Sequence, residues 1–99
     1  MRAAVLHEAR TPMLIEDVSI DGPRDDEVLV QVRATGACHS DYHVIDGSWH
    51  EPGYPLPMIL GHEAAGVVEK VGADVNSVKP RDHVILSFAP NCGSAACAR

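Results

Sequence analysis

The stretch EVLVQVRA, residues 27–34, has the clearest strand pattern in the chain and decides the fold class. Apolar residues occupy every second position and would therefore share one face of a strand, whereas the positions between them mix leucine with polar residues. The first face carries Val28, Val30, Val32 and Ala34, and the second carries Leu29, Gln31 and Arg33. This alternation predicts an antiparallel strand with one buried face.

The segments around this strand also favour short strands. Apolar or alternating runs predict strands over residues 3–6, 13–20, 63–71 and 83–88, and Gly66 predicts a bulge within the third of these. Residues 40–45 suit a short helix, and the Pro- and Gly-rich residues 47–57 suit a stiff loop. We therefore expect one small, mainly β domain, a barrel or sandwich, with its chemistry on loops.

Composition excludes several classes of function. The chain has 99 residues, a formal net charge of −6 and no basic run, so nucleic acid and anionic lipid are poor partners. Its apolar runs are too short for a membrane span or a signal peptide. Three cysteines, an odd number, argue against a disulfide framework. A cytoplasmic location, with free thiols or metal-ligating cysteines, is the expectation.

Two clusters carry the residue types of a metal site. Cys38, His39, Ser40, Asp41 and His43 follow the best strand directly, and the run GHEAAG occupies residues 61–66. Zinc is bound by cysteine and histidine side chains, and a fold that joins these two loops could offer both. Spacing alone leaves open the alternative that Cys38 is a small buried apolar residue.

Other common motifs are incomplete. Residues 61–66 share the glycine spacing of a phosphate-binding loop, but Val67 and Val68 stand where that loop needs lysine and a hydroxyl residue. Gly66 stands where a helical zinc protease would have its second histidine. The sequence contains no G-x-G-x-x-G fingerprint of dinucleotide binding.

The motifs together resemble the medium-chain, zinc-dependent alcohol dehydrogenases. GHEAAGVV at residues 61–68 is similar to the zinc signature of that family, and GACHSD at residues 36–41 is similar to its first ligand loop. PRDHV at residues 80–84 resembles its P-G-D-x-V turn. The resemblance covers essentially the whole chain. It implies that residues 1–99 are part of a GroES-like catalytic domain, a distorted β-barrel with short helices, without the Rossmann domain.

The resemblance also implies roles for individual residues. Cys38 and His62 would be ligands of the catalytic zinc, Glu63 would lie beside the metal and enter its coordination shell, and Asp41 would orient His62. Ser40 would accept the alcohol proton and His43 would pass it outward. His39 would contact the cofactor pyrophosphate, and Ser40, Trp49 and Phe88 would contact the substrate. Packing under the Pro-rich loop is an equal alternative for Trp49.

The implied reaction is the oxidation of a primary or secondary alcohol to an aldehyde or ketone. Zinc and NAD or NADP are the implied cofactors, a small alcohol or aldehyde is the implied substrate, and a homo-oligomer is implied at full length. Two alternatives stay open: a truncated, non-catalytic GroES-like zinc-binding module, and a zinc-free relative of the quinone reductases. The Cys38–His62 pair argues against the second.

Three features depart from the family pattern. Cys92 and Cys97 could be ligands of a structural zinc, but Ala95 and Ala98 stand where its next cysteines are expected, so the spacing favours a degenerate lobe. Arg81 replaces the usual turn glycine. The family's third zinc ligand would lie beyond Arg99, so we expect residues 1–99 alone not to oxidise alcohols.

Overall fold

The structure is a computed structural model, and it describes residues 1–49 and 54–89. Within these ranges the chain forms five strands and one helix: β1 (Arg2–Val5), β2 (Leu14–Asp17), β3 (Val28–Thr35), α1 (His39–Ile45), β4 (Ala64–Val71) and β5 (His83–Ile85). The fold is therefore mainly β, as expected, with one short helix among the described residues. None of the described helical segments is long and apolar enough to cross a membrane.

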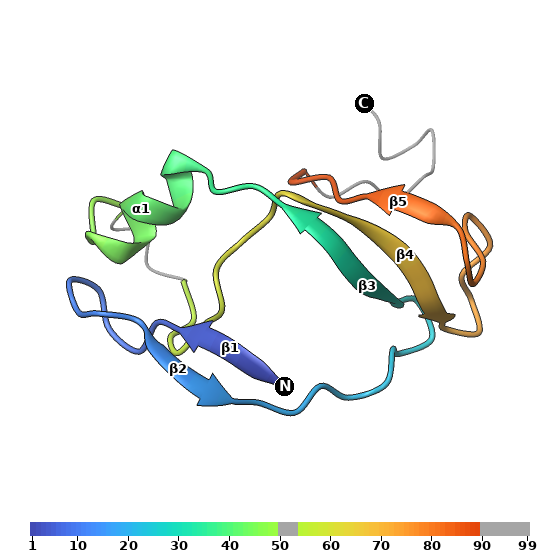
Figure 1. The fold of residues 1–99 in the computed structure, drawn as a ribbon, viewed down its shortest axis with the longest axis horizontal. Helices are drawn as coiled ribbons and strands as arrows, with labels where there is room; N and C mark the ends of the chain where they lie inside the picture. Colours follow the sequence, from blue (N-terminus) through green and yellow to red (C-terminus); the bar gives the residue numbers. More distant parts are fainter. Residues whose placement is uncertain (50–53, 90–99) are drawn as a thin grey trace.

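The strands form two antiparallel sheets. β1 pairs with β2, and β3, β4 and β5 form a three-stranded sheet with β4 in the middle. Figure 1 shows the three-stranded sheet on one side of the molecule, with α1 and the β1–β2 pair on the other. The end of β3 and the start of β4 point towards α1. These two strand ends therefore lie between the three-stranded sheet and the half of the fold that contains α1, β1 and β2.

The β3–β4 ladder contains two irregularities of opposite kind. Glu69 of β4 is left without a partner between the Leu29–Lys70 and Val30–Val68 pairs. Arg33 of β3 is left out further along, just beyond the pair that Val32 forms with Gly66. The extra residue near Gly66 thus belongs to β3, and not to β4 as the sequence pattern predicted. A side chain at Gly66 would collide with the Gln31 carbonyl, so this glycine permits close approach of the two strands.

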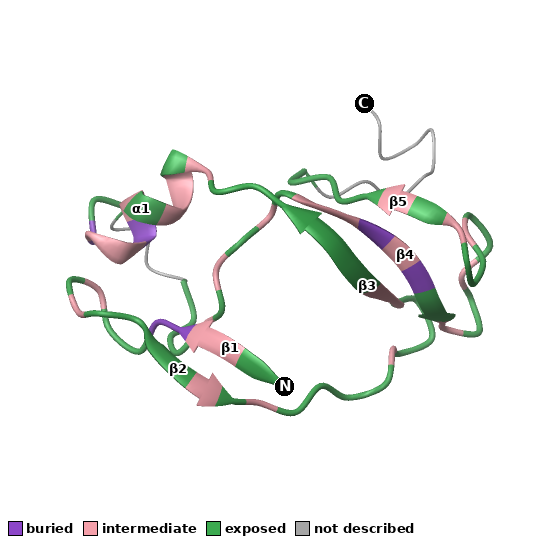
Figure 2. Cartoon of the chain, viewed as in Figure 1, coloured by how far each residue is buried: buried purple, intermediate pink, exposed green. Residues whose placement is uncertain are grey.

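The buried core is small. Val5, Leu6, Val44 and Val68 are the buried apolar residues of the described chain, and they come from both halves of the fold (Figure 2). Leu6, which is fully buried, exchanges two backbone hydrogen bonds with Met58. The predicted burial of one β3 face is not seen, because Val28 and Val30 are only half-buried, as is Leu29 on the other face. Further along, Val32 is 51% exposed and Ala34 is also exposed.

Two further expectations need correction. The strand predicted over residues 83–88 ends at Ile85, because Leu86 makes the last backbone hydrogen bond to β4, through the Ala64 carbonyl. The strand predicted over residues 13–20 contracts to Leu14–Asp17, the part that pairs with β1.

Candidate functional site: a Cys–His–Glu group

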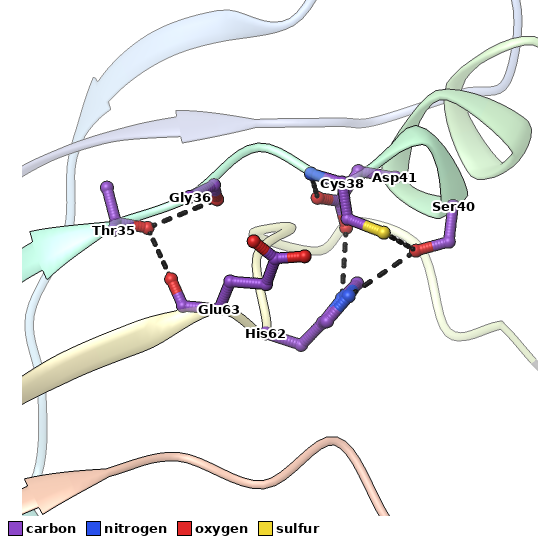
Figure 3. A network of polar contacts seen from close by, with 7 residues as sticks. All are labelled: Thr35, Gly36, Cys38, Ser40, Asp41, His62 and Glu63. Carbon is purple, nitrogen blue, oxygen red and sulfur yellow. Dashed lines mark hydrogen bonds and ion pairs between the residues drawn. The ribbon is translucent and has the colours of Figure 1, made fainter.

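Antiparallel pairing brings two distant loops together. Thr35 ends β3 and pairs with Ala64, which begins β4. Cys38 follows shortly after β3, and His62 and Glu63 directly precede β4. The loop that leads out of β3 and the loop that leads into β4 therefore lie side by side, as Figure 3 shows.

The two loops present three potential metal ligands to one another. One ligand atom each from Cys38, His62 and Glu63, namely a sulfur, a ring nitrogen and a carboxylate oxygen, lie within 4.8 Å of one another. Cys38 and His62 are half-buried, whereas Glu63 is exposed. The three residues that the resemblance places at the catalytic zinc thus form one cluster.

Asp41 contacts both ligand-bearing loops. Its Oδ1 lies 3.4 Å from His62 Nδ1, and its Oδ2 accepts a hydrogen bond of 3.4 Å from the Cys38 backbone N–H. The Asp41 and His62 side chains are 20% and 23% exposed. A carboxylate at Nδ1 favours the tautomer with its proton on that nitrogen, which leaves Nε2 free to bind a metal.

Ser40 lies within the same cluster. Its hydroxyl donates a hydrogen bond of 3.1 Å to Cys38 Sγ, and its oxygen lies 3.4 Å from His62 Nε2 (Figure 3). His43 lies one helical turn further along α1. Its ring is edge-on to His39 at 4.8 Å and stacks on Trp49 at 5.5 Å. Its buried Nδ1 has no hydrogen-bond partner within residues 1–49 and 54–89.

A cleft of about 660 Å³ opens beside the cluster. Its walls include Cys38, Ser40, His62 and Glu63 together with the apolar residues Trp49, Ile85, Leu86 and Phe88. The Phe88 ring lies 4.7 Å from the His62 ring, and Phe88 is 68% exposed. The cleft has the size of a small-molecule site. It also contains both predicted substrate-contacting aromatic residues, whose roles remain predictions.

The remaining predicted site residues lie elsewhere. His39 is exposed, contacts Tyr42 and His43, and does not line this cleft. Cys92 and Cys97, the candidates for a structural zinc, lie outside the described residues. Beyond the end of α1, hydrogen bonds from Ser48 hold the pKa of Asp46 below its usual value.

Sequence reasoning missed the contribution of Thr35 and Gly36. Both donate hydrogen bonds to the Glu63 carbonyl, Thr35 from its hydroxyl at 2.8 Å and Gly36 from its backbone at 2.9 Å. It also missed Tyr54, whose ring stacks on Trp49 at 6.3 Å. The one local sequence signal for the Thr35 and Gly36 contacts is a hydroxyl residue at the end of a strand, followed by glycine.

Comparison with known proteins identifies the family. Residues 24–99 match the model of the alcohol dehydrogenase GroES-like domain, so the match covers most of the chain. The chain belongs to this family. The GroES-like fold predicted from the resemblance is thereby confirmed, and no Rossmann domain is present in the described residues.

Individual relatives are alcohol dehydrogenases. The NDMA-dependent alcohol dehydrogenase of Amycolatopsis methanolica is 53% identical over 94% of this chain and 24% of its own length. The class-3 alcohol dehydrogenase of Cereibacter sphaeroides is 50% identical over 92% of this chain and 24% of its own length. This GroES-like domain chain therefore spans about a quarter of the length of the curated relatives it matches.

Solved structures agree in fold. An alcohol dehydrogenase zinc-binding domain protein from Burkholderia ambifaria matches with a TM-score of 0.83 and 48% identity, over 98% of this chain and 25% of its own. The benzyl alcohol dehydrogenase of Acinetobacter calcoaceticus matches with a TM-score of 0.83 and 37% identity, over 98% of this chain and 26% of its own. The GroES-like domain is thus an alcohol dehydrogenase-type domain in both sequence and fold.

Proposed function

We propose that this GroES-like domain is the N-terminal catalytic-domain portion of a zinc-dependent, NAD- or NADP-linked alcohol dehydrogenase. The observation that carries the proposal is the group of ligand atoms from Cys38, His62 and Glu63, which lie within 4.8 Å of one another at the wall of a cleft. The alcohol dehydrogenase relatives support the same chemistry. The substrate is a small alcohol or aldehyde.

The donor set fits zinc. A thiolate sulfur, an imidazole nitrogen and a carboxylate oxygen are the three ligand types that zinc takes in proteins. Cys38 and His62 are the proposed ligands, with Glu63 beside them. Asp41 supports this assignment, because carboxylates commonly accept the second ring N–H of a metal-binding histidine.

The residues around the cleft would bind the alcohol and remove its proton. When bound, zinc supplies a Lewis acid for the alcohol oxygen and the nicotinamide supplies a hydride acceptor. Ser40 Oγ, at the cluster, accepts the hydroxyl proton of the alcohol and releases its own proton towards His43. The imidazole of His43 passes that proton on to solvent. Trp49 and Phe88 hold the apolar part of the substrate.

The proposals for cofactor and assembly draw on the family resemblance. His39, exposed at the start of α1, is the proposed contact to the cofactor pyrophosphate. The assembled enzyme is proposed to be a homo-oligomer. A reducing cytoplasm is the proposed location, since it keeps the Cys38 thiol available for metal.

Metal analysis combined with an NAD(P)H assay tests the proposal in the complete protein. Cys38→Ala and His62→Ala should remove most of the zinc and nearly all alcohol oxidation. His83→Ala is a matched control, because His83 is an exposed residue of β5 that does not line the cleft. Wild-type protein without zinc, or a Cys38→Ala variant with normal zinc content and turnover, would contradict the assignment.

A further inference from the structure

The backbone carbonyl of Glu63 is held from two sides by the end of β3. The Thr35 hydroxyl donates to it at 2.8 Å (Figure 3). The Gly36 backbone N–H also donates to it, at 2.9 Å. A carbonyl oxygen has two lone pairs, and the two donors use both of them. Among the described residues, the other hydrogen bonds from side chains to backbone carbonyls span at most three positions, whereas this one joins residues 28 positions apart.

This carbonyl belongs to the backbone of the loop that carries two of the three proposed ligands. Glu63 is itself one proposed ligand, and its neighbour His62 is another. Thr35 lies three positions before Cys38, the third. The Thr35–Glu63 hydrogen bond therefore connects the loop that carries Cys38 to the loop that carries the other two ligands, at the end of the ladder that pairs them.

Gly36 makes this close approach possible. A Cβ atom at Gly36 would run into the Glu63 side chain, with its carboxylate oxygen as the nearest atom. A side chain at residue 36 would therefore displace the Glu63 carboxylate from its place beside Cys38 and His62. Gly36 leaves room for the carboxylate, while Thr35 holds the carbonyl of the same residue.

We propose that Thr35 is a positioning residue for the metal site, and that its hydroxyl holds the Glu63 carbonyl so that the two ligand-bearing loops keep one relative placement. This inference rests on the proposed function, since it concerns the affinity and geometry of the zinc that the cluster binds. Thr35 touches none of the ligand atoms itself, so its effect passes through the backbone at Glu63.

Zinc competition against a chromogenic chelator and the absorption spectrum of the cobalt-substituted protein test the proposal. Thr35→Val keeps the branched shape that suits a strand but removes the hydroxyl donor. We expect it to weaken zinc binding about tenfold, the lower end of the range for residues that support metal ligands, and to broaden or shift the cobalt d–d bands. Thr35→Ser restores the donor and should restore both properties.

A matched control separates this effect from the general loss of a hydroxyl. The Thr11 hydroxyl donates to the Glu8 backbone carbonyl at 2.7 Å, away from the ligand group. Thr11→Val should leave zinc affinity and the cobalt spectrum unchanged. Equal losses in Thr35→Val and Thr35→Ser, or a Thr35→Val variant indistinguishable from wild type, would overturn the proposal.

A second variant tests the same peptide unit from the other side. Gly36→Ala should push Glu63 away and lower zinc affinity, with melting curves showing that the variant is folded. Wild-type protein that binds no zinc would overturn the proposed function as well, whereas zinc-binding wild type with an unaffected Thr35→Val variant would overturn this inference alone.

Discussion

Asp41 Oδ1 lies 3.4 Å from His62 Nδ1, while the other oxygen of the same carboxylate accepts the Cys38 backbone N–H. One side chain at the start of α1 thus orients the ring of one proposed ligand and the backbone of another. Because α1 begins directly after Cys38, the short helix places this carboxylate between the two loops.

Asp41→Asn should weaken zinc binding about tenfold in the complete protein. An amide has the shape of the carboxylate but a single oxygen and no charge, so it can accept only one of the two contacts. Zinc competition titrations measure the change. Asp74→Asn, at an exposed carboxylate after β4, is the control and should bind zinc as wild type does. Equal affinities for all three proteins would contradict the orienting role of Asp41.

His43→Gln should retain its zinc but oxidise alcohol roughly tenfold more slowly near neutral pH, the lower side of general acid–base effects. The loss should shrink at high pH, where hydroxide takes the proton directly. The measurement is a pH–rate profile with metal content determined on the same samples, and His83→Gln is the control. Superimposable profiles would make His43 an ordinary helix residue, and loss of zinc would make its role structural.

Arg81→Gly should raise the stability of the protein by about 0.5–1 kcal/mol. Arg81 has a φ of 77°, in the left-handed region that costs a residue with a side chain about 1 kcal/mol or more. Its backbone hydrogen bond to the Val68 carbonyl, 2.8 Å long, remains available to glycine. Urea unfolding midpoints measure the change.

Arg24→Gly is the control for this prediction. Arg24 is exposed and does not have a positive φ, so glycine there adds freedom to the unfolded chain and removes an exposed 4.0 Å ion pair with Glu27, which contributes little. Its unfolding midpoint should stay level or fall. An Arg81→Gly variant that behaves in the same way as Arg24→Gly would show that the turn is unstrained.

Asp82→Asn should reduce stability at neutral pH but not in acid. Hydrogen bonds from Lys79, through its ammonium at 2.6 Å and its backbone N–H at 3.0 Å, lower the pKa of Asp82. Because the folded-state pKa is the lower one, the carboxylate stabilises the fold above its unfolded value of about 3.9. That contribution is lost as the pH falls through the folded-state pKa.

Unfolding midpoints measured from pH 7 down to pH 2 check this prediction. The difference between wild type and Asp82→Asn should close as the pH falls, while Asp74→Asn should follow wild type throughout. A constant difference across the whole range would mean that the Asp82 carboxylate acts through shape alone.

Sequence patterns located most elements because each pattern reflects local chemistry. β3, β4 and α1 each begin and end within one residue of their predicted ranges. For β3 the signal was the alternation of valines along the strand. β5 was predicted too long, because the apolar residues Leu86 and Phe88 continue past the last β4 partner. Pairing partners, and not composition, decide where such a strand ends.

The sequence named the three residues whose side chains lie together, Cys38, His62 and Glu63, but it named only one of the contacts around them. Cysteine and histidine are rare enough to draw attention in a sequence, and the resemblance assigned Asp41 as well. A donor to a backbone carbonyl, such as the Thr35 hydroxyl, leaves no side-chain pattern at its acceptor. The stacking of Trp49 on His43 and of Tyr54 on Trp49 likewise has no signal in the sequence pattern.

The two irregularities of the β3–β4 ladder mark the positions at which this part of the chain can change in length. Glu69 adds one residue on β4 and Arg33 adds one on β3, so the pairing at the Thr35 end has the same register as at the Val28 end. Because neither residue has a partner across the ladder, deleting either one leaves every pair from Val28–Val71 to Thr35–Ala64 able to form and removes only a local bend. Deleting a paired residue instead, such as Val67, would force the rest of the strand to slip by one position and would turn its side chains to the other face.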